Sequence, residues 1–75
     1  MTTASLEALM RNVIRHRRLP FTLHSVSGVL DAWHIVVCDA AGATLSLTVP
    51  AGRPVDVRSA VQDRLETAVE DAAFR

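Results

Sequence analysis

The chain has 75 residues, of which 49% are hydrophobic and 21% charged, and this composition indicates one small folded domain rather than a disordered segment. Eight arginines balance eight acidic residues, so the formal net charge is zero with histidine neutral, which argues against a general nucleic-acid-binding protein with a basic excess. No apolar run approaches the roughly 18 residues of a membrane span, and the single cysteine, Cys38, cannot form an internal disulfide.

The first predicted element is an amphipathic helix between Leu6 and Arg18. Its apolar residues recur at i, i+3, i+4, i+7 and i+8, which places them on one face: Leu6, Leu9, Met10, Val13 and Ile14. We expect Thr3 or Ser5 to cap the first turn and Pro20 to end the helix.

Three strands are predicted next, because the hydrophobic period changes to two from residue 21 onward. They cover residues 21–28, 33–38 and 44–49, and a tight turn at residues 39–42 joins the last two. One face of the sheet should meet the helices through Phe21, Leu23, Trp33, Ile35, Val37, Leu45, Leu47 and Val49. The opposite face should carry Thr22, His24, Val26, His34, Val36, Cys38, Thr44, Ser46 and Thr48.

A second helix is predicted for residues 57–73, with Asp56 as its N-cap, after the proline and glycine residues of 50–54 end the third strand. The predicted fold is a two-layer α+β domain spanning residues 1–75, with the element order α-β-β-β-α. Its three-stranded antiparallel sheet has the order 1-2-3, and both helices pack on one face.

The basic side of the first helix is the first candidate site. Glu7, Arg11, Arg15 and Arg18 recur at i, i+4, i+8 and i+11, which predicts one outward stripe. Residues 1–18 hold four arginines and one acid, whereas residues 56–75 hold three arginines and five acids. The stripe either complements the helix dipole and aids solubility, or it binds an anionic partner. A protein partner is favoured over nucleic acid, because three or four arginines neutralise few phosphates.

The uncovered sheet face is the second candidate site. It is neither charged nor strongly apolar, so it is either an ordinary solvated surface or a surface for a partner or a homodimer. In the second case Val36 lies at its centre, with His34 beside it.

The sequence contains no recognisable catalytic or metal-binding constellation. His24, His34 and Cys38 are predicted on one face, but His34 and Cys38 are four residues apart, or about 13 Å along a strand, which is too far for one shared ion. We find no paired carboxylates, nucleophile–base set or glycine-rich phosphate loop. We therefore expect no enzymatic activity, no cofactor and no metal.

These observations favour a small protein-binding module or regulator. The expected partner-binding residues are Arg11, Arg15, Arg18, Val36 and His34. The alternative is a nucleic-acid-binding module that uses the same arginines. The small size, the single cysteine and the lack of a signal peptide favour a cytoplasmic protein of bacterial or phage origin.

The element order α-β-β-β-α at this length resembles the double-stranded RNA-binding domain. That family contacts RNA through its first helix, a loop with glycine and histidine between the first two strands, and a lysine cluster at the start of the last helix. Here the loop at residues 27–34 contains Gly28 and His34, whereas residues 55–60 contain one arginine and no lysine. The resemblance therefore implies the fold, and it implies duplex RNA binding only as the alternative function.

Overall fold

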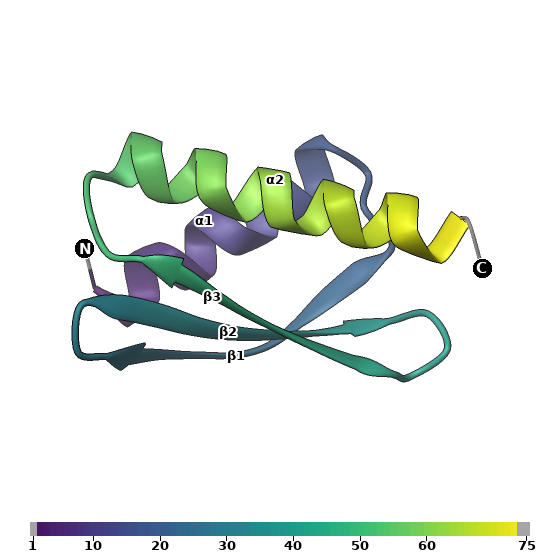
Figure 1. Cartoon of the computed structure of the whole chain (residues 1–75), viewed down its shortest axis with the longest axis horizontal. Helices are drawn as coiled ribbons and strands as arrows, with labels where there is room; N and C mark the ends of the chain where they lie inside the picture. The colour runs from purple at the N-terminus through teal and green to yellow at the C-terminus, as the bar shows by residue number, and fades with distance from the viewer. Residues whose placement is uncertain (1, 74–75) are drawn as a thin grey trace.

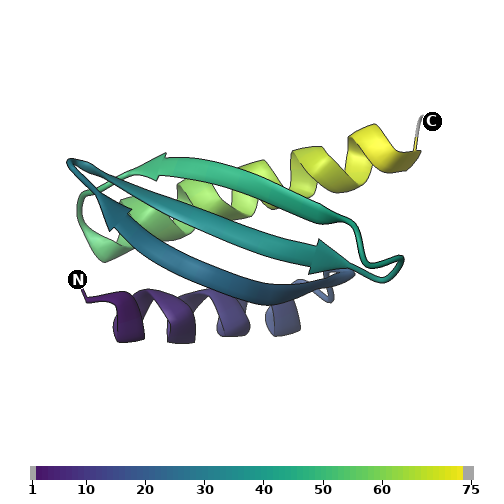
Figure 2. The same cartoon turned by 90° about the horizontal axis from the view of Figure 1, so that it is seen from below.

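The structure is a computed structural model that describes residues 2–73. It consists of helix α1 (Thr3–His16), strands β1 (Phe21–Val29), β2 (Ala32–Asp39) and β3 (Thr44–Pro50), and helix α2 (Pro54–Ala73). The strands form an antiparallel sheet in the order β1-β2-β3. Both helices lie on the same side of the sheet (Figure 1), with α1 beside β1 and α2 beside β3 (Figure 2). The predicted α+β fold, with its element order and strand order, is confirmed.

The core lies between the sheet and the two helices, and every element except β1 contributes buried residues to it. They are Leu6, Met10, Val13, Ile35, Val37, Leu47, Val49, Val57, Val61 and Leu65. The predicted inward residues Phe21, Leu23, Trp33 and Leu45 are half-buried and pack against this cluster. Burial of a side chain of this size contributes about 1.5–3 kcal/mol, so this shared core is what holds both helices against the sheet.

The start of each helix differs from the prediction. Thr2 is the N-cap of α1, and its Oγ1 accepts a hydrogen bond of 3.1 Å from the backbone N–H of Ser5. Helix α2 begins at Pro54, where the fixed φ of proline suits the first helical turn. Asp56, the predicted N-cap, lies inside that first turn and accepts a hydrogen bond from Nε of Arg53 at 3.1 Å.

The end of α1 also differs, and this difference moves Arg18 off the helical stripe. The backbone N–H of Leu19 donates to the carbonyl of Ile14 (3.0 Å), and that of Arg18 donates to Arg15 (3.2 Å). This is the pattern of a Schellman motif, which needs a left-handed residue after the helix. Arg18 occupies that position with φ of 53°, so the prediction of a helical Arg18 in line with Arg11 is wrong.

A β-bulge in β1 reverses which residues face the core. Leu23 pairs with Val37, but Ser25 pairs with Val36, so His24 is an extra residue in the ladder. After the bulge, Val26 packs against the core instead of lying on the open sheet face. The prediction of Val26 as an open-face residue is therefore wrong, because strict alternation does not continue through a bulge. His24 is exposed and is the residue left out of the ladder.

The turn between β1 and β2 is shorter than predicted. The two strands extend to Val29 and Ala32, which leaves only Leu30 and Asp31 as the loop. Leu30 is fully exposed and has φ of 52°, a conformation that favours glycine or asparagine in two-residue hairpins.

Within residues 2–73, neither helix is both long and apolar enough to span a lipid bilayer.

Candidate functional site

Arg11 and Arg15 form the exposed basic part of α1. Among residues 2–73, neither side chain takes part in an ion pair or a side-chain hydrogen bond, and Arg11 is not paired with Glu7, which lies four residues before it on the helix. Three other arginines have partners: Arg17 with Glu66 (3.8 Å), Arg53 with Asp56 (3.1 Å) and Arg58 with Oδ1 of Asn12 (2.9 Å). Arg11 and Arg15 are thus exposed and unpaired within the described residues.

A shallow groove of about 310 Å³ lies between the last turns of α1 and the start of β1. Arg11, Arg15 and Ile14 line it from the helix, and Phe21, Thr22 and Leu23 line it from the strand. The groove therefore combines two positive charges with three half-buried apolar side chains. Arg18, which the sequence also suggested, does not line the groove, although it is exposed at the turn between the two elements.

The strand side of this groove is an edge of the sheet. The described strands place β1 at one side of the sheet with β2 as its neighbour, and α1 runs alongside it in the opposite direction (Figure 2). An edge strand leaves alternate backbone N–H and C=O groups without partners in the sheet. The groove therefore offers hydrogen-bonding groups of the backbone in addition to its side chains.

The open sheet face contains Val36 and His34 as predicted, and both are half-buried. Val36 lies opposite Ser25 on one side and Ser46 on the other, and His34 lies between Ser27 and Thr48. Val36 is therefore an isolated apolar side chain among small hydroxyl groups, and the structure does not bring it together with Arg11 or Arg15.

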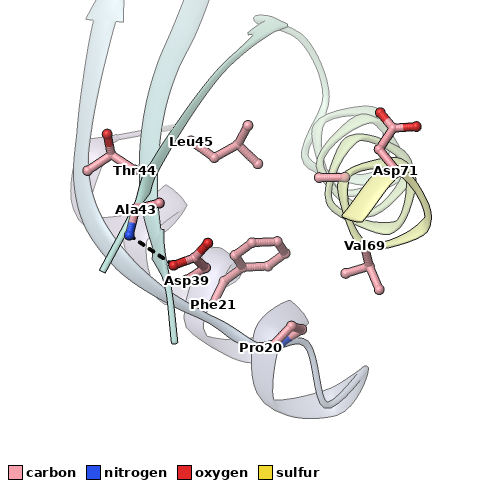
Figure 3. A pocket seen from close by; sticks show the side chains of 9 residues that line it. Pro20, Phe21, Asp39, Ala43, Thr44, Leu45, Val69 and Asp71 are labelled. Carbon is pink, nitrogen blue, oxygen red and sulfur yellow. Dashed lines mark hydrogen bonds between the residues drawn. The ribbon is translucent and has the colours of Figure 1, made fainter. Parts of the chain in front are cut away.

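A second hollow of about 320 Å³ lies under the last turns of α2, and the sequence analysis did not identify it. Phe21, Leu45 and Val69 point toward it from β1, β3 and α2, as Figure 3 shows. Its polar members are Asp39, Thr44 and Asp71, but Oδ1 of Asp39 already accepts hydrogen bonds of 2.9 Å from the N–H groups of Ala41 and Ala43. This hollow thus presents mainly an apolar surface with few polar groups free to orient a ligand.

A scan against protein-family models finds no matching family, and searches of curated proteins and of solved structures find no match to this chain. The resemblance to the double-stranded RNA-binding domain therefore stays a prediction that rests on element order.

Within residues 2–73, no group of three or more histidine, cysteine, aspartate or glutamate residues is placed to hold a metal ion.

Proposed function

We propose that this protein is a small binding module that recognises an acidic surface of a partner protein through the groove between α1 and β1. The observation that carries the proposal is that Arg11 and Arg15 line a groove with Ile14, Phe21 and Leu23 and have no partner among the described residues. Protein interfaces typically combine apolar contact with arginine, which keeps its charge and forms directed hydrogen bonds to carboxylates.

The charge distribution favours a protein over a nucleic-acid duplex. Arg17, Arg53 and Arg58 are occupied by partners within the chain, so few arginines near the groove remain for phosphates. Two or three phosphate contacts give weak binding with a strong salt dependence. An acidic protein segment needs only two carboxylates to match Arg11 and Arg15, and the methylene groups of these acidic side chains add apolar contact with Ile14, Phe21 and Leu23.

The proposal is tested by fluorescence anisotropy with a labelled oligoglutamate peptide of about ten residues, and in parallel with labelled duplex RNA and DNA, at about 50 and 200 mM salt. We expect binding of the peptide and none of the duplexes. Replacing Arg11 and Arg15 together by glutamate should abolish peptide binding. Arg64→Glu is the matched control, because Arg64 is also an exposed helical arginine but lies outside this groove.

Two results would contradict the proposal. Micromolar, salt-sensitive binding of a duplex that depends on Arg11 and Arg15 would favour the nucleic-acid alternative. Loss of peptide binding in Val36→Glu, with full binding in the Arg11 and Arg15 variants, would instead place the site on the open sheet face.

A further inference from the structure

The groove between α1 and β1 lies along a strand edge, and this determines the shape of the partner it fits. Phe21, Thr22 and Leu23 are the part of the edge that lines the groove. An extended segment can pair with such an edge through backbone hydrogen bonds, while its side chains contact the neighbouring helix. On the basis of the proposed function, we infer that an extended acidic segment of a partner protein binds here as an additional strand beside β1.

The spacing of the two arginines matches the repeat of a strand. Arg11 and Arg15 are four residues apart on α1, which corresponds to about 6 Å along the helix axis. Alternate side chains of a strand are about 6.6 Å apart and point to the same side. Because α1 runs alongside β1, a segment with acidic residues at positions i and i+2 can place one carboxylate near each arginine.

The two faces of the added strand would meet different surfaces. Its helix-facing side chains lie near Ile14, Phe21 and Leu23, which are half-buried and apolar, with the arginines at the rim. Its other side chains lie next to Thr22, whose partner across the sheet is Cys38 on the open face. The site therefore prefers a segment whose acidic residues occupy alternate positions to one that has the same negative charge in another order.

The bulge at His24 limits the length of the segment. The ladder of β1 is regular from Phe21 to Leu23, the part that lines the groove, is interrupted at His24, and resumes in a shifted register from Ser25 to Val29. Three residues of strand correspond to about 10 Å, so the added strand is short and its contact area is below that of a stable complex. We expect an affinity in the micromolar range or weaker, with rapid exchange.

The test uses an acetylated, labelled peptide of about seven residues in which glutamate alternates with valine. A peptide of the same composition, with its three glutamates at the first, second and fifth positions, is the first control (the rearranged peptide), because no two of these glutamates are two residues apart and so no such pair can face the two arginines from one side. Two further peptides carry N-methyl groups on all glutamates or on all valines. In a strand, the N–H groups of alternate residues point to opposite edges, so only one of these two peptides loses the hydrogen bonds to β1.

We expect the alternating peptide to bind more tightly than the rearranged peptide, and only one of the two N-methylated peptides to lose about tenfold in affinity. Arg11→Gln and Arg15→Gln should each weaken binding by about two- to fivefold, and Arg64→Gln should leave it unchanged. If the two N-methylated peptides behave alike while the Arg11 and Arg15 variants still lose affinity, strand addition is overturned and the proposed function stands. If neither the alternating nor the rearranged peptide binds at about 50 mM salt, strand addition and the proposed function are both overturned.

Discussion

Arg18→Gly should make the protein more stable than Arg18→Ala, although glycine is the more flexible residue. Arg18 has φ of 53° at the position after α1 where the Schellman motif places a left-handed residue. This conformation costs a residue with a Cβ about 1–2 kcal/mol, and glycine avoids that cost. Glycine also gives the unfolded chain more conformational freedom, which lowers the free energy of unfolding by about 0.4–1 kcal/mol. The glycine variant should therefore have a free energy of unfolding about 1 kcal/mol higher than the alanine variant.

The comparison that isolates this effect is Arg18→Gly against Arg18→Ala, because both variants lose the same positive charge near the end of the helix. A difference of about 1 kcal/mol corresponds to about 4–8 °C in Tm for a domain of this size. Urea unfolding followed by the fluorescence of Trp33, which is half-buried in β2, measures the free energy directly. The reasoning is refuted if the glycine variant unfolds at the same urea concentration as the alanine variant, or at a lower one.

Three further predictions follow from the fold. Ile35→Ala should lose about 2–5 kcal/mol of stability, because Ile35 is fully buried. Val36→Ala on the open sheet face should lose under about 1 kcal/mol. Equal losses of stability in thermal melts would contradict the assignment of the two residues to opposite faces of the sheet. Asp39→Ala should lose about 1–2 kcal/mol in urea unfolding because two backbone N–H groups lose their acceptor, and Asp39→Asn, which keeps an acceptor oxygen, should lose less. Leu30→Asn should raise Tm by a few degrees relative to Leu30→Ala, since asparagine tolerates positive φ; a lower Tm than the alanine variant would count against strain at this turn.

The overall fold could be predicted because hydrophobic spacing and breakers agreed along the whole chain. The alternation of Leu45, Leu47 and Val49 and the helical spacing of Val57, Val61 and Leu65 identified the elements and their inward faces. What could not be predicted were features that depend on backbone geometry alone. The extra residue at His24 leaves no mark in residue type, and it changes the side on which every later residue of β1 lies.

The candidate site was only partly predictable for the same reason. The i, i+4 spacing of Arg11 and Arg15 on an amphipathic helix is a local property, and it correctly placed both side chains at the surface. The proximity of these arginines to Phe21 and Leu23 is a tertiary property, set by how the turn after α1 directs the chain into β1. Helical continuation suggested Arg18 as the next member of the stripe, but the hydrogen bonds of the Schellman motif end the helix before it.

The bulge at His24 also bears on the behaviour of the protein at high concentration. An unpaired strand edge invites the sheets of two molecules to join, and repeated joining leads to aggregation. A bulge interrupts the even spacing of backbone groups and increases the local twist, so a second flat strand cannot follow the full length of β1. The bulge thereby makes the edge of β1 a poor template for growth of an extended intermolecular sheet.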